Sequence, residues 1–231
     1  MRSILALAAA VAATFSMIGS AQALTLGFTE EFATNVSGWE NAGALPLTWE
    51  ADGGPDASSN ASTTFNWFGF SNPFGGGPVI FRGASADDAS GGAFVGNWLT
   101  GGVTTISAWF YQETGTALTP FIRFASSFNF PGAVINGTTP VPTNTWTQVV
   151  FDIDPLNPLC FGEGVTCDVA LSNVGNVQFG TDAPASLVAT DQAYYLAIDK
   201  IGINTVPEPA TGLMLAAALL GLGAARRRRS A

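Results

Sequence analysis

The sequence predicts an all-β protein, an antiparallel two-sheet β-sandwich of jelly-roll type. Three observations support this fold class. The chain between residues 24 and 205 consists of short runs rich in Val, Ile, Phe and Trp. Gly, Pro, Ser, Thr and Asn interrupt these runs at frequent intervals, as in sandwiches with many tight turns. Several runs alternate apolar and polar residues, which is the period of a strand buried on one face.

About nine to eleven short strands fit this pattern, which suits one sandwich domain over residues 24–205. Residues 51–62, 82–92 and 129–143 are predicted loops, and residues 155–168 carry both cysteines. In the clearest strands, Ile106 and Phe110 alternate with Trp109, and Val149 and Phe151 alternate with polar neighbours. The predicted strands cover residues 24–32, 45–50, 93–99, 103–112, 119–127, 145–153, 176–181 and 193–203.

An aromatic segment, residues 63–81, lies near the middle of the chain. A period of two places Phe65 and Trp67 on one face of a strand and Phe68 and Phe70 on the other. Rings on both faces indicate a strand buried on both sides, or a strand that offers rings to a ligand such as a sugar. Both interpretations stay open from the sequence.

The N-terminal residues 1–23 have the features of a secretory signal peptide. Arg2 supplies a positive charge, residues 4–18 are apolar, and Ala21-Gln22-Ala23 is a small-x-small cleavage site. We expect export by the Sec machinery and cleavage after Ala23. An uncleaved membrane anchor is the alternative.

The C-terminal residues 206–231 contain three parts in a fixed order. Pro207-Glu208-Pro209 favours extended backbone, because proline lacks an N–H donor and restricts the residue before it. Residues 210–225 carry no charge and are predicted to form a transmembrane helix. Residues Arg226, Arg227, Arg228 and Arg229 would remain on the cytoplasmic side. These features alone are consistent with a plain membrane anchor.

The same three parts, in this order, resemble the PEP-CTERM sorting signal of Gram-negative bacteria. The resemblance covers about a tenth of the chain and concerns sorting. It implies an inner-membrane precursor that a membrane-embedded exosortase cuts near the Pro-Glu-Pro motif. The mature protein would then reach the cell envelope or the extracellular matrix, as when a GPI signal is removed.

Charge and composition exclude several function classes. Residues 24–206 contain three basic residues (Arg82, Arg123 and Lys200) and sixteen acidic ones, a formal charge of −13. Such a surface repels nucleic acid and anionic lipid, and it suits a protein that meets cations such as calcium. The chain has no histidine, which removes Ser-His-Asp and Cys-His catalysis and most zinc sites.

The two cysteines, Cys160 and Cys167, lie close together in an exported chain. An oxidising compartment favours a disulfide that closes a small loop, with two free thiols as the alternative. The spacing is not Cys-x-x-Cys, so a redox role is not expected.

Three local patterns in the body also carry resemblances. Residues 146–152 (WTQVVFD) resemble the W-x-x-V strand of jelly-roll carbohydrate-binding and adhesion domains, and residues 194–201 resemble their last strand. Residues 178–182 resemble the Q-F-x-x-D signature of one group of PEP-CTERM proteins. In such jelly rolls a calcium ion often ties the first strand to the last. The matching residues would be Glu30 or Glu31 with Asp199, which could equally be solvated charges at strand ends.

Three functions of different classes follow. The first is a structural or adhesive matrix protein in an exopolysaccharide or biofilm setting, without enzyme activity. The second is a carbohydrate-binding module. The third and weakest is a glycan hydrolase that uses paired carboxylates, for example Glu50 with Glu113. The binding module would use a platform of Trp67, Phe68, Phe70 and Trp109.

Overall fold

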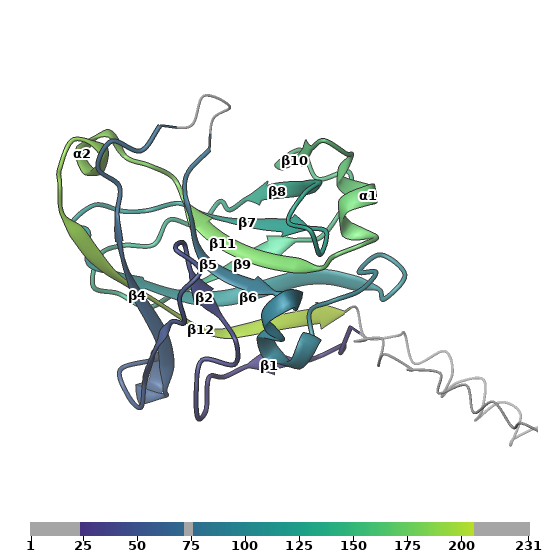
Figure 1. Cartoon of the computed structure of the whole chain (residues 1–231), viewed down its shortest axis with the longest axis horizontal. Helices are drawn as coiled ribbons and strands as arrows, with labels where there is room; N and C mark the ends of the chain where they lie inside the picture. Colours follow the sequence, from purple (N-terminus) through teal and green to yellow (C-terminus); the bar gives the residue numbers. More distant parts are fainter. Residues whose placement is uncertain (1–23, 72–75, 206–231) are drawn as a thin grey trace, which may run out of the picture.

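The computed structural model describes residues 24–71 and 76–205. They form two antiparallel sheets packed face to face, which confirms the predicted all-β sandwich (Figure 1). The expected signal peptide (1–23), sorting motif (207–209), apolar helix (210–225) and arginine cluster (226–229) lie outside the described residues. No helix within the described ranges is both long enough and apolar enough to span a membrane.

The first sheet, here called sheet A, is built around the long last strand. Strand β1 (Thr29–Glu30) pairs with the later half of β12, so the two ends of the described chain lie side by side. The other strands follow the order β3-β4-β12-β6-β9. They are β3 (Thr48–Glu50), β4 (Asn60–Asn66), β12 (Ala193–Thr205), β6 (Val103–Gln112) and β9 (Thr147–Asp152).

The second sheet, sheet B, has the order β10-β8-β7-β11-β5-β2. Its strands are β10 (Cys160–Glu163), β8 (Gly132–Asn136), β7 (Pro120–Ala125), β11 (Asn176–Thr181), β5 (Val79–Ala84) and β2 (Glu40–Asn41). Two short helices, α1 (Cys167–Leu171) and α2 (Ala185–Val188), lie at the edges (Figure 1). Three 3₁₀ turns complete the fold: η1 (Pro55–Ala57), η2 (Ser85–Asp87) and η3 (Ala89–Gly92).

The core between the sheets is rich in aromatic rings. Trp39 is fully buried and stacks on Phe179 with ring centroids 6.0 Å apart, and its indole N–H donates to Ser90 Oγ at 2.8 Å. A Cβ on Gly83 would lie 2.7 Å from the Trp39 ring, so only glycine fits at that position of β5. The apolar faces predicted for residues 103–112 and 145–153 point into this core.

Three local predictions are wrong. Only Thr29–Glu30 of the expected strand 24–32 is a strand. Residues 93–99 form turns and no named strand. Within these turns, the buried Trp98 donates a hydrogen bond from Nε1 to the Phe94 carbonyl. The predicted loop 129–143 contains β8, whose Ala133 and Ile135 are buried. Pro and Gly neighbours hide that strand, and a short apolar run does not distinguish a strand from a buried turn.

Candidate functional site: the aromatic face of sheet A

Sheet A carries a group of partly exposed rings on its outer surface. We call Trp109, Tyr111, Trp146 and Tyr195 the aromatic face. In β6, residues Ile106, Ala108 and Phe110 are buried in the core, so Trp109 and Tyr111 point outward. Trp146 lies directly before β9, and Tyr195 lies on β12. The face therefore comes from three neighbouring strands.

Tyr111 lies at the centre of the aromatic face. Its ring is 5.6 Å from that of Trp146, tilted by 41°, and 6.0 Å from that of Tyr195 in an edge-to-face arrangement. Contacts of this kind hold rings in defined orientations. Each of the three rings is partly accessible to solvent. The aromatic face can therefore offer preordered rings to a ligand.

Two carboxylates flank the rings. Glu50 accepts hydrogen bonds from the Tyr195 hydroxyl at 2.8 Å and from Ser62 Oγ at 2.6 Å. Glu113 is exposed, its backbone N–H bonds to the Tyr195 carbonyl, and its Oε1 lies 3.3 Å from the Tyr111 hydroxyl. Glu50 and Glu113, the pair named as an example of a catalytic pair, thus lie near different tyrosine hydroxyls, and both lie within electrostatic range of Tyr195.

These surroundings change the acidity of both tyrosines. Burial raises the pKa of the Tyr195 hydroxyl, and the hydrogen bond to Glu50 raises it further. Burial also raises the pKa of the Tyr111 hydroxyl, followed by the charge of Glu113 and the hydrogen bond to it. Both phenols therefore remain protonated donors at neutral pH.

The loop between β3 and β4 forms one border of the aromatic face. Its Gly53 carbonyl accepts a hydrogen bond from Trp146 Nε1 at 2.7 Å, although the two residues are 93 positions apart. Asn60 Nδ2 donates to the Asp52 carbonyl, and Ser58 Oγ donates to Asp199 Oδ2 at 2.8 Å. The loop therefore covers the middle of β12 and leaves the tyrosines accessible beside it.

Under this loop lies Asp199, one of the residues predicted to bind calcium. It is fully buried, and its Oδ1 accepts the backbone N–H of Lys200 at 2.7 Å. Burial raises the pKa of its carboxyl to about 6, against the lowering effect of the Ser58 hydrogen bond. Asn60 is also fully buried, and its Oδ1 has no hydrogen-bond partner. Continuing the pairing of Ile198 with Ala61 places Asn60 opposite Asp199.

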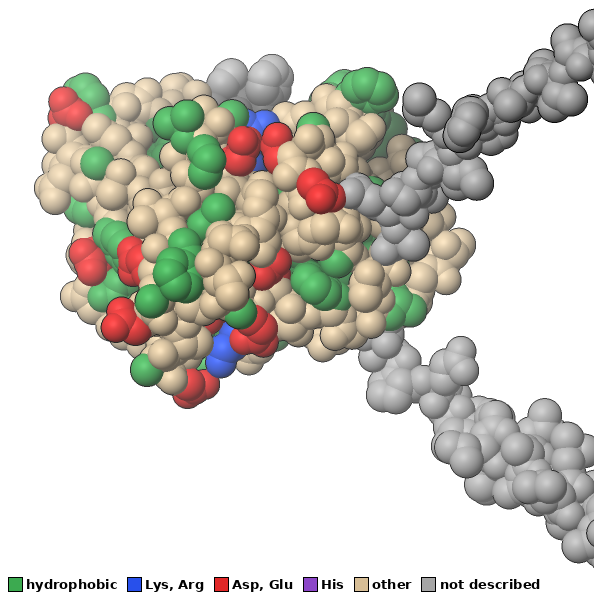
Figure 2. Space-filling view, turned by 60° about the horizontal axis from the view of Figure 1, so that its bottom comes forward, with side chains coloured by type: hydrophobic (Ala, Val, Ile, Leu, Met, Phe, Trp, Pro, Cys, Tyr) green, Lys and Arg blue, Asp and Glu red, His purple; other side chains and the backbone are tan. Residues whose placement is uncertain are grey.

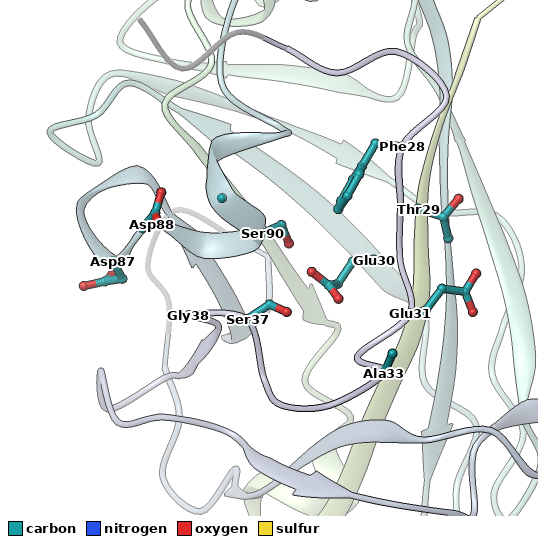
Figure 3. Close-up of a pocket in the computed structure, with 11 residues that line it drawn as sticks. Phe28, Thr29, Glu30, Glu31, Ala33, Ser37, Gly38, Asp87, Asp88 and Ser90 are labelled. Atoms are coloured by element: carbon teal, nitrogen blue, oxygen red, sulfur yellow. The ribbon is translucent and has the colours of Figure 1, made fainter. Parts of the chain in front are cut away.

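The other two predicted calcium ligands, Glu30 and Glu31, point in opposite directions, because successive side chains alternate along the extended chain at β1. Glu30 is 7% exposed, and its Oε1 accepts the Phe32 N–H, whereas Glu31 is exposed. Glu30 lines a cleft of about 640 Å³ with Ser90, Asp87 and Asp88. Figure 3 shows Glu30 pointing toward the η3 turn, Glu31 pointing the other way and Asp87 pointing outward. Over residues 24–71 and 76–205, no three acidic, histidine or cysteine side chains cluster as a metal-binding group, so a cation here would also need amide or carbonyl oxygens as ligands.

The predicted ring platform does not form as one surface. Trp67 is fully buried and packs edge-to-face on Phe65, so its ring is not available to a ligand. Phe68 is 56% exposed and Phe70 is partly buried, but both lie beyond Asn66 at the end of β4, which pairs with Ala193. Trp109 pairs with Asp199, six residues or about 20 Å further along β12. Of the four, only Trp109 belongs to the aromatic face.

Sequence reasoning missed Tyr111, Trp146 and Tyr195 as members of one surface. Tyr111 and Trp109 share a strand face by alternation, so the sequence was sufficient to predict their association. Pairing of β6 with β9 and β12 brings the other two rings beside them. The predicted disulfide between Cys160 and Cys167 is confirmed, and it links β10 to α1.

Comparison with known proteins supports the sorting signal. Residues 205–229 match the family model of the PEP-CTERM protein-sorting motif. The chain therefore carries the sorting signal of an exported protein, and the motif implies exosortase processing of a membrane-anchored precursor. No curated protein matches the chain.

Several solved structures show a distant likeness to this chain. They include an exo-β-agarase (TM-score 0.49, 11% identity, 79% of this chain and 25% of that chain). The CBM22-1–GH10 modules of Clostridium thermocellum xylanase 10B, complexed with xylohexaose, give a TM-score of 0.47 at 13% identity, covering 81% of this chain and 30% of that chain. The CBM22-1 xylan-binding domain of Paenibacillus barcinonensis Xyn10C gives 0.43 at 13% identity, covering 81% and 100%. Likeness at this level assigns no ligand to this chain.

Proposed function

We propose that this exported protein attaches to polysaccharide of the envelope or matrix through the aromatic face of sheet A. The matrix and binding-module hypotheses then describe one activity, adhesion to glycan, and no catalytic step is required. The observation that carries the proposal is the set of ordered, partly exposed rings of Tyr111, Trp146 and Tyr195, flanked by hydrogen-bonding carboxylates. Sugar rings stack on such surfaces through their C–H faces, and their hydroxyls bond to the polar rim.

The strong negative charge of the domain fits this role. Residues 24–206 carry a formal charge of −13. Figure 2 shows acidic side chains spread over one face of the molecule with few basic ones among them. Nucleic acid and anionic lipid are poor partners for such a surface.

Affinity electrophoresis of the full chain, purified in detergent, tests the binding activity. Gels would contain neutral, acidic or amino polysaccharides, and retardation gives the affinity. We expect Tyr111→Leu and Trp146→Ala to weaken retention by about tenfold, as for central aromatic residues of binding sites. Phe68→Ala is the matched control, because Phe68 is 56% exposed but lies away from the aromatic face. Equal loss in the control, or no retention by any glycan, would refute the proposal. Sugar released in the gel would instead reveal hydrolysis.

The intact mass of the protein tests the sorting step. We expect cells that contain the exosortase to yield a chain that ends near Pro209, and cells that lack it to retain residues 210–231. The signal peptide is expected to be absent from both. If the C-terminal segment is retained in both strains, the protein is a membrane-anchored domain and release into the matrix is ruled out.

We also propose a structural calcium ion beside Asp199. The support is the buried Asn60 Oδ1 without a hydrogen-bond partner, next to a fully buried carboxylate with Glu31 in electrostatic range. Calcium binds six to eight oxygens, several of them from carbonyls. A melting temperature that rises by several degrees with millimolar calcium, and does not rise in Asp199→Asn, would support the site. An unchanged melting temperature in the wild-type protein would exclude it.

A further inference from the structure

Both charged side chains that flank the aromatic face are acidic. Two carboxylates, Glu50 and Glu113, flank its rings. Of the basic residues that the structure describes, only Lys200 lies on sheet A, beside Asp199 on β12. Arg82 and Arg123 belong to strands of sheet B, and Lys200 pairs with Asp56 at 3.2 Å. A ligand on this face therefore meets two carboxylates, and the one described cation of sheet A, Lys200, is already paired with Asp56.

Exposed Glu113 lies close to two rings. It is opposite Tyr195 on the neighbouring strand, where its N–H bonds to the Tyr195 carbonyl. Its Oε1 also lies 3.3 Å from the hydroxyl of Tyr111. A carboxylate at the hydroxyl end of one ring, with the faces of other rings nearby, is an arrangement that can bind an ammonium group. The ring attracts the cation through its quadrupole, and the carboxylate accepts charge-assisted hydrogen bonds.

We infer that the ligand of the aromatic face is an amino polysaccharide, a polymer of hexosamine units that carry free ammonium groups. This inference rests on the proposed function and specifies its substrate class. The hexosamine rings stack on Tyr111 and Trp146, and an ammonium group lies against Glu113. Polymers of uronic acids or sulfated sugars are repelled by the same carboxylates and by the domain charge. Neutral polymers gain the stacking but leave Glu113 without a cationic partner.

The decisive experiment compares two glycans that differ only in the substituent on nitrogen, an ammonium group or a neutral acetamide. The full chain, purified in detergent, is titrated with short, soluble chains of β-1,4-linked glucosamine polymer and with the same short chains after complete N-acetylation. We expect the free-amine polymer to bind about five- to tenfold more tightly, in the range of one cation–π contact plus one ion pair. Glu113→Gln keeps an acceptor oxygen but removes the charge. It should abolish this preference by lowering the affinity for the free-amine polymer to that for the acetylated one.

A control is needed because any acidic protein attracts a polycation. Asp168→Asn makes the same change in net charge at an exposed carboxylate on α1, beside sheet B. We expect it to retain the preference within twofold. Equal loss in Glu113→Gln and Asp168→Asn would mean non-specific attraction and would overturn the inference. Equal binding of both polymers, still sensitive to Tyr111→Leu, would overturn it while the proposed function stands. No binding of either polymer or of any neutral glycan would refute both.

Discussion

The hydroxyl of Tyr195 on β12 donates a hydrogen bond to Glu50 Oε2 on β3 at 2.8 Å, across the intervening strand β4. Ser62 on β4 donates to the other oxygen of the same carboxylate at 2.6 Å. The Glu50 carboxylate therefore accepts hydrogen bonds from side chains of two strands, β12 and β4. The hydrogen bond between Tyr195 and Glu50 sets the position of the Tyr195 ring, against which Tyr111 packs edge-to-face. The outermost strand of sheet A thus helps to order rings that lie on the strands beyond β4.

Replacing Tyr195 by phenylalanine tests this bond. Tyr195→Phe removes a hydrogen bond to a carboxylate, so we expect the free energy of unfolding to fall by about 1–2 kcal/mol. The melting temperature should then fall by about 3–6 °C for a domain of this size. Tyr194→Phe is the control, because Tyr194 packs on Trp67 but makes no hydroxyl hydrogen bond to the described residues. Melting curves that coincide for the two variants would show that the Tyr195–Glu50 bond contributes nothing measurable.

The members of the aromatic face show how much of the candidate site can be predicted from the sequence. Alternation along residues 103–112 predicts that Trp109 and Tyr111 share the outer side, and the structure agrees. Trp67 follows the same rule locally, yet it is buried, because it lies just past the end of β4 and packs on Phe65. Period-two patterns assign rings to one side or the other of a strand. They do not say which side is covered, since that depends on the neighbouring strands and loops.

Long-range strand pairing explains why some contacts of the site could not be predicted from the sequence. The association of Glu50 with Tyr195 joins residues 145 positions apart, and that of Trp146 with Gly53 joins residues 93 apart. Both depend on the strand order β3-β4-β12-β6-β9, which local patterns do not encode. The disulfide was predictable because its cysteines lie only seven residues apart in an exported chain.

Asp199 should make stability depend on pH. Burial raises the pKa of its carboxyl to about 6, against about 3.9 in an unfolded chain. The folded protein therefore binds more protons between these values. The stability from this group is present below about pH 4 and is lost as pH rises through 6. The groups that face it are Ser58, Glu31 and Lys200.

Urea unfolding of Asp199→Asn and the wild type between pH 4 and 7, in chelator, measures this contribution. The variant has no titrating group at this position. Its stability relative to the wild type should therefore rise by up to about 2 kcal/mol between pH 4 and pH 7. A constant difference across this range would contradict the raised pKa. With calcium present, the wild type should regain stability at pH 7 if the proposed ion binds.

Arg123 connects β7 of sheet B to the loop that follows it. Its Nε donates to Glu163 at 2.6 Å, Nη1 donates to Asn129 Oδ1 and Gln178 Oε1, and Nη2 donates to the Asn129 carbonyl. Gln178 is only 2% exposed. Arg123→Lys cannot reproduce this planar fork, so Gln178 Oε1 would lose its donor.

We expect Arg123→Lys to lower the free energy of unfolding by about 2–3 kcal/mol. Arg82→Lys provides the control on β5, on the other side of β11 from β7, because Arg82 makes no hydrogen bond or ion pair through its side chain to the described residues. Denaturant titration compares the two. A loss of similar size for both substitutions would attribute the effect to arginine packing in general, and not to the hydrogen-bonded fork.

The disulfide between Cys160 and Cys167 holds β10 against α1, where Cys167 packs with Ala133 and Ala170 in a small cluster apart from the main core. Because the loop is short, a double Cys160→Ser and Cys167→Ser variant should lose about 2–3 kcal/mol, mostly through a less restricted unfolded chain. Hydrogen exchange should accelerate in β10 and α1 before it does in β6 and β12, since the small cluster has few other contacts to retain it. Binding to glycan should be unaffected, as the aromatic face lies on the other sheet. If the double variant loses binding as well, the two sheets are coupled and the site is not confined to sheet A.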